Sequence, residues 1–465
     1  MSGLKDVRLD QRADWMLDRI VECGSLTITK VGGDRAGEIA AHRFLDSERV
    51  APEDLLAKAR ERTVQAAAGL RIVAIQDTTE INFSGRDAKR RGLGPAGDGK
   101  AKGFFIHPLV AVDADSDALL GVVDAKIWTR DADTSARPHR HQRALEDKES
   151  YRWLEAAVSA RDHLGQAAQS CVVVGDRESD IYPLFARLPE GIDIVVRAAR
   201  NRIVKAQKVL AQIEAQDQDA SRTATKLFEA AAQLPVRMQC DVPVPARPGQ
   251  RARTARVTIK AGQVCLQRPS NSHLDDAPKS LTLNFVEAQE STAPAGTTPL
   301  CWRLYTTLDV TTPEAACEVV RLYRLRWRIE EVFRVLKSDG LDLAASQVTA
   351  ADRLFKLAAL GVISAARIIQ LRDARDGSSR PASDCIDVAD YAAVAALSAA
   401  LEGGTERQRN PHTAGGLAWL AWVVARLGGW NCYYKPPGPK TMACGWARLN
   451  DRLEGYRLAS APKDV

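Results

Sequence analysis

Hydrophobic positions change their spacing several times along the chain. Residues 1 to about 65 have helical spacing, most clearly over Pro52–Ala68, where a proline in the first turn suits a helix start. Apolar runs of strand length then follow, interrupted by turns and one helical stretch. Alternating polar and apolar residues from about 205 to 300 predict antiparallel strands. After about residue 345 the spacing is almost entirely helical.

Two of the apolar runs lead directly into an aspartate. The run LRIVAIQ precedes Asp77, and the run SCVVVG precedes Asp176. At the end of a strand in an α/β sheet the following loop leaves a carboxylate exposed, which suits a ligand for a divalent metal. Strand-end aspartates are common, and a capping or structural role is the usual alternative.

The stretch YRLRWRIEEVFRVLK, Tyr323–Lys337, predicts an amphipathic helix. At about 100° per residue, its core-facing stripe consists of Leu322, Leu325, Ile329, Val332, Phe333 and Leu336. Tyr323, Arg326, Glu330 and Lys337 fall within about 60° of one another beside this stripe. Nearby cations favour an ionised carboxylate, so we expect Glu330 to be charged. A solvated face with salt bridges is the alternative.

Composition and charge narrow the classes of protein. The chain has 465 residues, a formal net charge of +6 and a pI near 8.8. This mildly basic balance permits a polyanionic partner without requiring one. Runs of basic residues at Lys89–Arg91, Arg137–Arg143 and Arg197–Arg202 favour a phosphate-binding surface, although such runs are often only solvated faces.

Cysteine usage and apolar segments indicate a cytoplasmic protein. The nine cysteines are odd in number and form no CxxC pair, which argues against a disulfide framework and a zinc site. The opening residues contain no apolar signal region. The most apolar segments, Leu357–Ile369 and Leu417–Leu427, are short and each contains an arginine. We therefore expect no membrane partner.

Asp77, Asp176 and Glu330 together provide three carboxylates. Mg²⁺ prefers hard oxygen ligands, few of them from protein, and Mn²⁺ suits the same ligands. Three carboxylates suffice to hold two such ions about 4 Å apart across a scissile phosphate. One ion then activates the attacking water and the other stabilises the leaving oxygen. The three acids therefore predict a two-metal phosphodiester site.

The pattern Y-x2-R-x3-E-x6-K, filled by Tyr323, Arg326, Glu330 and Lys337, resembles the signature of one group of bacterial DDE transposases, the insertion-sequence family numbered four. The segments AIQDTT, VVGDRESDIY and KESYRW also resemble segments of that family, in the family order. So do AHRFLDSERV near the start and GPKTMACGWARL near the end. The resemblance covers nearly the whole chain.

The resemblance implies an α/β fold with a ribonuclease-H-like catalytic core at residues 67–345, containing an all-β insertion at about 205–315. It implies an N-terminal helical domain, residues 1–66, that binds DNA ends, and a C-terminal helical dimerisation domain, residues 346–465. The family usually carries a longer stretch before the segment that LDQRADWMLDRIV resembles. Two interpretations stay open: the end-binding domain is shortened, or the start of the sequence is misassigned.

The implied activity is cut-and-paste transposition of an insertion sequence through a DNA hairpin. The implied cofactor is a pair of Mg²⁺ ions, with Mn²⁺ as a substitute. The implied partner is double-stranded DNA, both element ends and target, bound by a homodimer in the bacterial cytoplasm at the nucleoid. The alternatives are a catalytically silent DNA-binding inhibitor, a domesticated remnant, or a nuclease of this fold that does not join strands.

The resemblance also assigns roles to residues. The implied metal ligands are Asp77, Asp176 and Glu330. The implied phosphate contacts are Tyr323, Arg326 and Lys337. Trp302 matches a tryptophan that stacks on a flipped base, and equally fits a core position of its own strand. Arg197, Arg200 and Arg202 are expected to contact DNA, with a solvated turn as the alternative.

Overall fold

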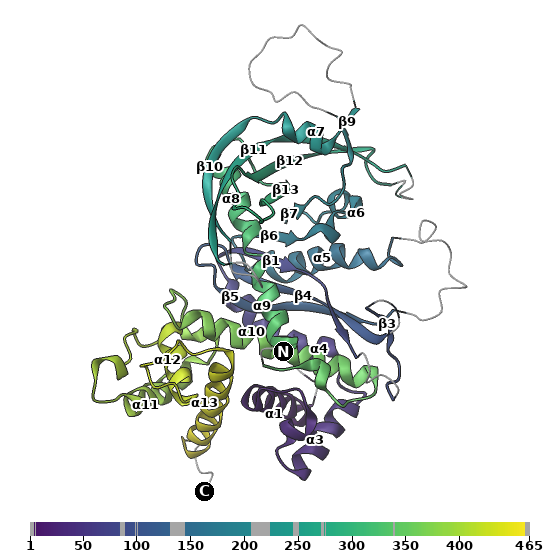
Figure 1. Ribbon diagram of the computed structural model, residues 1–465. Helices are drawn as coiled ribbons and strands as arrows, with labels where there is room; N and C mark the ends of the chain where they lie inside the picture. The colour runs from purple at the N-terminus through teal and green to yellow at the C-terminus, as the bar shows by residue number, and fades with distance from the viewer. Residues whose placement is uncertain are drawn as a thin grey trace.

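The protein is built on one mixed sheet with helices on both faces, as a computed structural model shows (Figure 1). The structure describes residues 4–460 except 5, 84–88, 98, 100, 131–144, 206–223, 245–250, 271–273, 275, 338 and 339. The basic run at 137–143 therefore lies outside the described residues. Within the described part, the sheet contains 13 strands.

Helices and strands have the following bounds. The helices are α1 (Val7–Cys23), α2 (Ile28–Gly32), α3 (Arg35–Asp46), α4 (Pro52–Ala67), α5 (Arg152–Leu164), α6 (Tyr182–Ala186), α7 (Leu227–Ala232), α8 (Pro313–Arg324), α9 (Trp327–Lys337), α10 (Ala351–Ala374), α11 (Tyr391–Leu401), α12 (Leu417–Leu427) and α13 (Pro439–Ser460). The strands are β1 (Arg71–Gln76), β2 (Thr79–Asn82), β3 (Gly94–Ala96), β4 (Ala101–Asp113), β5 (Leu119–Trp128), β6 (Ser170–Gly175), β7 (Asp193–Arg197), β8 (Ile203–Lys205), β9 (Ala224–Lys226), β10 (Val236–Val244), β11 (Arg253–Gln267), β12 (Ser280–Glu290) and β13 (Cys301–Thr306). Short 3₁₀ turns include η1 (Glu149–Tyr151), η2 (Arg177–Ser179), η4 (Leu343–Ala345), η5 (Ala382–Asp384), η6 (Val388–Asp390) and η7 (Glu406–Gln408).

The centre of the sheet has the strand order β5–β4–β1–β6–β7. Strands β1, β6 and β7 are parallel, whereas β4 is antiparallel to both β1 and β5. This order and direction are consistent with the expected ribonuclease-H-like core. β1 and β6 are buried from their second residue onward, which explains why both are continuous apolar runs.

Each face of the central sheet contributes to a different hydrophobic core. On β1, Ile72 and Ala74 join one core, which includes Trp153 from α5. Val73 and Ile75 point to the opposite face and join a larger core with helices α9 and α10. This alternation is the two-residue period of a strand. The sheet is therefore held between α5 on one side and α9 with α10 on the other.

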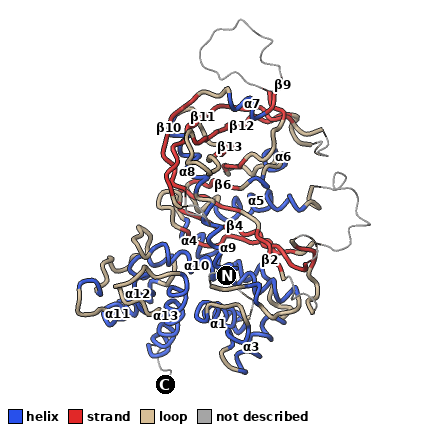
Figure 2. Tube along the Cα trace, viewed as in Figure 1, coloured by secondary structure: helices blue, strands red, loops and turns tan. Residues whose placement is uncertain are grey.

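Beyond β7 the same sheet continues as a mostly antiparallel extension, coloured red at one end of the molecule in Figure 2. β13 pairs with β7, and β12, β11 and β8 follow in turn. We expected this region to be all β, and that prediction is wrong. Helix α7 lies within it because Leu227 and Ala231, one helical turn apart, both reach the core.

The helices from the two ends of the chain lie side by side in Figure 1, with α1 packed against α13 and α10. One continuous core reaches from Leu4 near the start to Leu453 in α13. Lys356 of α10 adds a polar contact, because its Nζ donates to the carbonyl oxygens of Leu45 and Ser47 at the end of α3. The three expected domains thus share one core, and their boundaries stay a prediction.

Helix α10 contains the apolar segment Leu357–Ile369 and is longer than that segment. Among the described helices it alone is long and apolar enough to cross a membrane, by length and composition. Its most apolar window is 83% buried inside the protein, between the sheet, α4, α9 and α12. Its apolar character is therefore that of a central core helix.

Candidate active site

Strands β1 and β6 end side by side, each one residue before an aspartate. They are parallel neighbours, with Ile75 opposite Val174. Two residues further along each strand come Asp77 and Asp176. Because parallel strands end at the same edge of a sheet, the register brings these two carboxylates together. The strand ends are where the sequence predicted them.

Each aspartate has one oxygen held by a nearby backbone N–H. Thr78 N donates to Asp77 Oδ1 at 2.8 Å, and Glu178 N donates to Asp176 Oδ1 at 2.9 Å. The turn after β6 is tight, since a Cβ on Gly175 would collide with the Ser179 side chain. The backbone thus fixes one oxygen of each carboxylate and leaves the other for a different partner.

The stretch Tyr323–Lys337 is not one helix, contrary to expectation. α8 ends at Arg324 and α9 begins at Trp327. Between them the N–H groups of Leu325 and Arg326 donate to the carbonyls three residues earlier, and Arg328 and Ile329 do the same. These tighter bonds interrupt the α-helical ladder. The core stripe predicted from the sequence is nevertheless buried throughout.

Arg326, at this break, forms an ion pair with two of the three acids. Its Nη1 lies 2.7 Å from Asp77 Oδ2 and 3.2 Å from Glu330 Oε1. Both distances end on the same nitrogen, so the two carboxylates converge on one guanidinium group. The Arg326 side chain is 10% exposed, whereas that of Glu330 is 44% exposed. Glu330 therefore lies at the solvent side of the cluster.

The surroundings of Asp77 change its pKa strongly. Burial raises its pKa from 3.8 to about 7, and the charges of Asp176 and Glu330 act in the same direction. Arg326 and the Thr78 N–H oppose the rise. A cluster of carboxylates that repel one another in a partly buried position gains most from an added cation.

The chemistry of the three acids fits a divalent ion such as Mg²⁺, which prefers carboxylate oxygens. In the described residues no three His, Cys, Asp or Glu side chains already stand in ion-binding geometry. The cation between Asp77 and Glu330 is instead the Arg326 guanidinium. The donor set therefore fits an ion on condition that Arg326 releases Asp77 Oδ2.

Residues 69–365, nearly two thirds of the chain, match the family described as "Transposase DDE domain". The chain belongs to the transposase DDE-domain family. The matched region begins just before β1 and ends within α10, so it includes both strand ends, the antiparallel extension and the helix break. Members of this family generally use divalent metal ions and act on DNA, in agreement with the acids described above.

Three of the expected DNA-contact residues of this DDE domain lie together beside the acids. The rings of Trp302 and Tyr323 meet edge to face with centroids 5.3 Å apart, and both side chains are buried. Arg197 interacts with the Tyr323 hydroxyl and donates to the carbonyl oxygen of Cys301 at 3.1 Å. Burial raises the pKa of Tyr323, which therefore carries a neutral hydroxyl. Trp302 occupies a core position in this arrangement.

The remaining expected contacts differ in exposure. Arg200 and Lys337 are exposed. Arg202 is held by Asp180, with Nη2 at 2.7 Å from Oδ1, and its side chain is only 9% exposed. Asp180 is itself fully buried, so this ion pair anchors the turn after β7. The guanidinium of Arg202 is thus occupied within the protein.

Sequence reasoning missed one arginine close to the acids. Arg152, the first residue of α5, is buried and donates to Thr78 Oγ1 and Glu178 Oε2. These two partners are 74 and 26 residues away in the chain, so no local sequence pattern predicts the contacts. Behind Asp77, His107 Nε2 donates to Gln76 Oε1 at 3.0 Å, and His107 Nδ1 lies 2.9 Å from Thr78 Oγ1.

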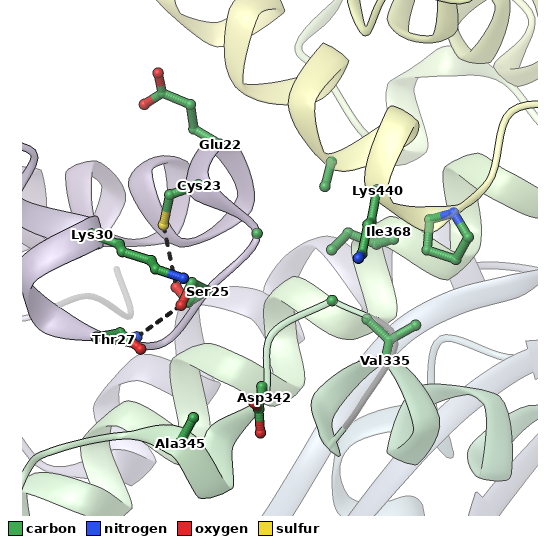
Figure 3. A pocket seen from close by; sticks show the side chains of 14 residues that line it. Glu22, Cys23, Ser25, Thr27, Lys30, Val335, Asp342, Ala345, Ile368 and Lys440 are labelled. Carbon is green, nitrogen blue, oxygen red and sulfur yellow. Dashed lines mark hydrogen bonds between the residues drawn. The ribbon is translucent and has the colours of Figure 1, made fainter.

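A cavity of about 430 Å³ lies elsewhere, where α1, the segment after α9, α10 and the start of α13 meet (Figure 3). Its lining includes Lys30, Lys440, Glu22 and Asp342, two cations and two anions. None of the three acids lines it. The acids sit instead at the edge of the sheet.

Proposed function

We propose that this chain is a DNA transposase that excises and inserts an insertion sequence by cut-and-paste, through a DNA hairpin. It acts on double-stranded DNA as a homodimer at the bacterial nucleoid, and its relatives are the insertion-sequence family numbered four. Residues 1–66 bind the element ends, and residues 346–465 dimerise. The observation that carries the proposal is the parallel register of β1 and β6, which juxtaposes Asp77 and Asp176.

In this proposal Asp77, Asp176 and Glu330 hold two Mg²⁺ ions, or Mn²⁺ in their place. Such ions, when bound, activate the attacking water and stabilise the leaving 3′ oxygen. Hydrolysis at the element end forms a bond from the water oxygen to phosphorus and breaks the bond to the 3′ oxygen. The freed 3′-OH then attacks a phosphate of the other strand, which forms the hairpin and releases the flanking DNA. Hydrolysis of the hairpin regenerates the 3′-OH, which then attacks a target phosphate and displaces a target 3′ oxygen.

The chain's own residues prepare this chemistry. The N–H groups of Thr78 and Glu178 each hold one oxygen of an aspartate, so the second oxygen is aimed at the site. Arg326 Nη1 contacts both Asp77 and Glu330. A scissile phosphate offers Arg326 a charge-assisted partner, and its transfer to that phosphate frees Asp77 Oδ2.

Other side chains bind the DNA in this proposal. Lys337, exposed at the end of α9, contacts phosphates near the cleaved end. Arg197 at the end of β7 and Arg200 in the following turn contact the DNA backbone, and Tyr323 joins Arg197. Trp302 stacks on the flipped base once the DNA opens the packed contact between its ring and that of Tyr323.

An excision assay in cells tests the proposal. A resistance gene is placed between the repeats that flank the natural gene, and the protein is supplied from a second plasmid. We expect a rejoined donor junction and insertion at new sites with the wild-type protein, and neither product with Glu330→Gln. Excision that persists in Glu330→Gln contradicts the assignment. Repeat binding without excision by the wild-type protein favours the silent DNA-binding alternative.

A further inference from the structure

We propose that Arg152 is a positioning residue that fixes the spacing between the loops carrying Asp77 and Asp176. It reaches no substrate in this role and acts through the residues that follow each aspartate. The inference rests on the proposed function only in treating the two aspartates as ligands. We call the contacts of Arg152 with Thr78 and Glu178 the clamp, and this clamp is a property of the folded chain.

The contacts of Arg152 span two loops and one turn. Nε donates to Thr78 Oγ1 at 2.9 Å in the loop after β1. Nη2 donates to Glu178 Oε2 at 2.6 Å in the loop after β6, and Nη1 donates to the carbonyl oxygen of Glu149 at 2.8 Å. The planar guanidinium presents these donors in a fixed fork. One side chain thus joins three segments that are distant in sequence.

The two loop partners of Arg152 are the same residues that orient the aspartates. Thr78 holds Asp77 Oδ1 through its backbone N–H and meets Arg152 through its hydroxyl. Glu178 holds Asp176 Oδ1 through its backbone N–H and meets Arg152 through its carboxylate. A continuous chain of hydrogen bonds therefore links Asp77 to Asp176 through Arg152. Displacement of Arg152 displaces both orienting N–H groups.

The position of the guanidinium is fixed by its surroundings. Its carbon lies 5.1 Å from the centre of the Trp153 ring and 5.6 Å from that of Trp128. Burial lowers the pKa of Arg152, and the charges of Glu178 and Glu149 oppose this. The Arg152 side chain is 9% exposed and that of Glu178 is 65% exposed, so solvent screens this pair from one side. The geometry therefore favours a role in orientation over a role in stability.

Hydrogen exchange of the full-length protein tests the clamp directly. We compare wild type, Arg152→Met and Arg130→Met, following peptides that contain Thr78 and Glu178. Arg130 is a matched control, because it also pairs with Glu149 and stacks over the Phe105 ring but donates no hydrogen bond to Thr78 or Glu178 in the described structure. We expect both loops to exchange at least about tenfold faster in Arg152→Met only. Unchanged exchange in either loop overturns the clamp.

Mn²⁺ binding tests the link from clamp to ligands. The free-Mn²⁺ electron paramagnetic resonance signal is titrated with each protein in the absence of DNA. We expect Arg152→Met to bind Mn²⁺ about tenfold more weakly, since lost outer-shell partners typically cost this much. Arg152→Lys, which can still reach one partner, should recover part of the affinity, and Arg130→Met should match wild type.

The outcomes separate the clamp from the proposed function. If Arg152→Met exchanges faster in both loops but binds Mn²⁺ as tightly as wild type, Arg152 does not position the ligands. If Arg152→Met only melts at a lower temperature, its role is structural and the proposal is wrong. If wild type binds no Mn²⁺, the proposed metal site fails, and the exchange result still decides whether the clamp exists.

Discussion

Arg326 and Asp77 form a buried ion pair at the centre of the candidate site, with Nη1 at 2.7 Å from Oδ2. The same nitrogen also reaches Glu330, so one guanidinium contacts two carboxylates that we assign as metal ligands. An arginine in this position and a divalent ion compete for the same oxygens. A guanidinium of the protein thus occupies the place that we propose for a divalent ion.

Arg326→Met should therefore bind Mn²⁺ more tightly than wild type in the absence of DNA, on the order of tenfold, because about 1.4 kcal/mol of competing interaction is enough. Titration of the free-Mn²⁺ resonance signal measures this. Arg328→Met is the matched control, since Arg328 lies two residues further along, in α9, and pairs with Glu331 and Asp373. Equal or weaker binding by Arg326→Met contradicts the competition.

Arg200 and Arg202, two residues apart, should behave in opposite ways. Arg202→Met leaves the buried Asp180 without its cation, so we expect a loss of about 3–5 kcal/mol in the free energy of unfolding. Arg200→Met should leave the free energy of unfolding unchanged and weaken binding to duplex DNA. The slope of log affinity against log salt concentration should fall by about one, the value for one lost phosphate contact. Denaturant unfolding and binding at several salt concentrations measure the two effects. A stable Arg202→Met protein contradicts the anchoring role.

Lys356→Met should weaken the attachment of the N-terminal helices to α10. The ammonium group binds the carbonyl oxygens of Leu45 and Ser47 at 2.9 and 2.8 Å, and its loss leaves both without this donor. We expect about 1–3 kcal/mol of destabilisation in denaturant unfolding. Lys58→Met, which breaks more exposed pairs with Asp10 and Asp14, should cost at most about 1 kcal/mol. Equal losses in the two variants argue against the prediction.

Asp18, where α1 meets α13, should make stability depend on pH. Burial raises its pKa from 3.8 to about 7, against the opposing hydrogen bond from Asn450. The folded protein then keeps a proton that the unfolded chain has lost, so this contribution to stability falls as pH rises from about 4 to 7. Asp18→Asn should remove this loss and stabilise the protein at pH 8 by about 1–2 kcal/mol, after allowance for partial exposure. Unfolding at pH 5 and pH 8 tests this, and equal effects at both contradict it.

The strand ends were predictable because of how buried parallel strands are built. β1 and β6 are covered on both faces, so their sequences are apolar throughout and the first acid after each run marks its end. The core stripe around α9 was likewise readable, because helical spacing alone decides which side chains face the core. These two local patterns are sufficient to locate Asp77, Asp176 and Glu330.

The environments of the neighbouring residues were not predictable from local patterns. A helical wheel assumes one continuous helix, whereas three-residue hydrogen bonds break the helix at Arg326. The wheel placed Tyr323 at a solvent margin, but Trp302 from β13 covers it. Arg202 looked like a free basic residue until the fold brought Asp180 to it, and Arg152 meets its partners only in the folded chain. The surroundings of Tyr323, Arg202 and Arg152 thus depend on tertiary contacts.

The most direct test is a cleavage assay with purified protein and a short duplex bearing the repeats that flank the gene. Wild type is compared with Asp77→Asn, Asp176→Asn and Glu330→Gln, with and without Mg²⁺, and DNA binding is measured in parallel. The account predicts Mg²⁺-dependent cutting at the repeat boundary by wild type alone, with DNA binding retained by all four proteins. Wild-type cleavage by any one of the three variants would contradict the ligand assignment at that position.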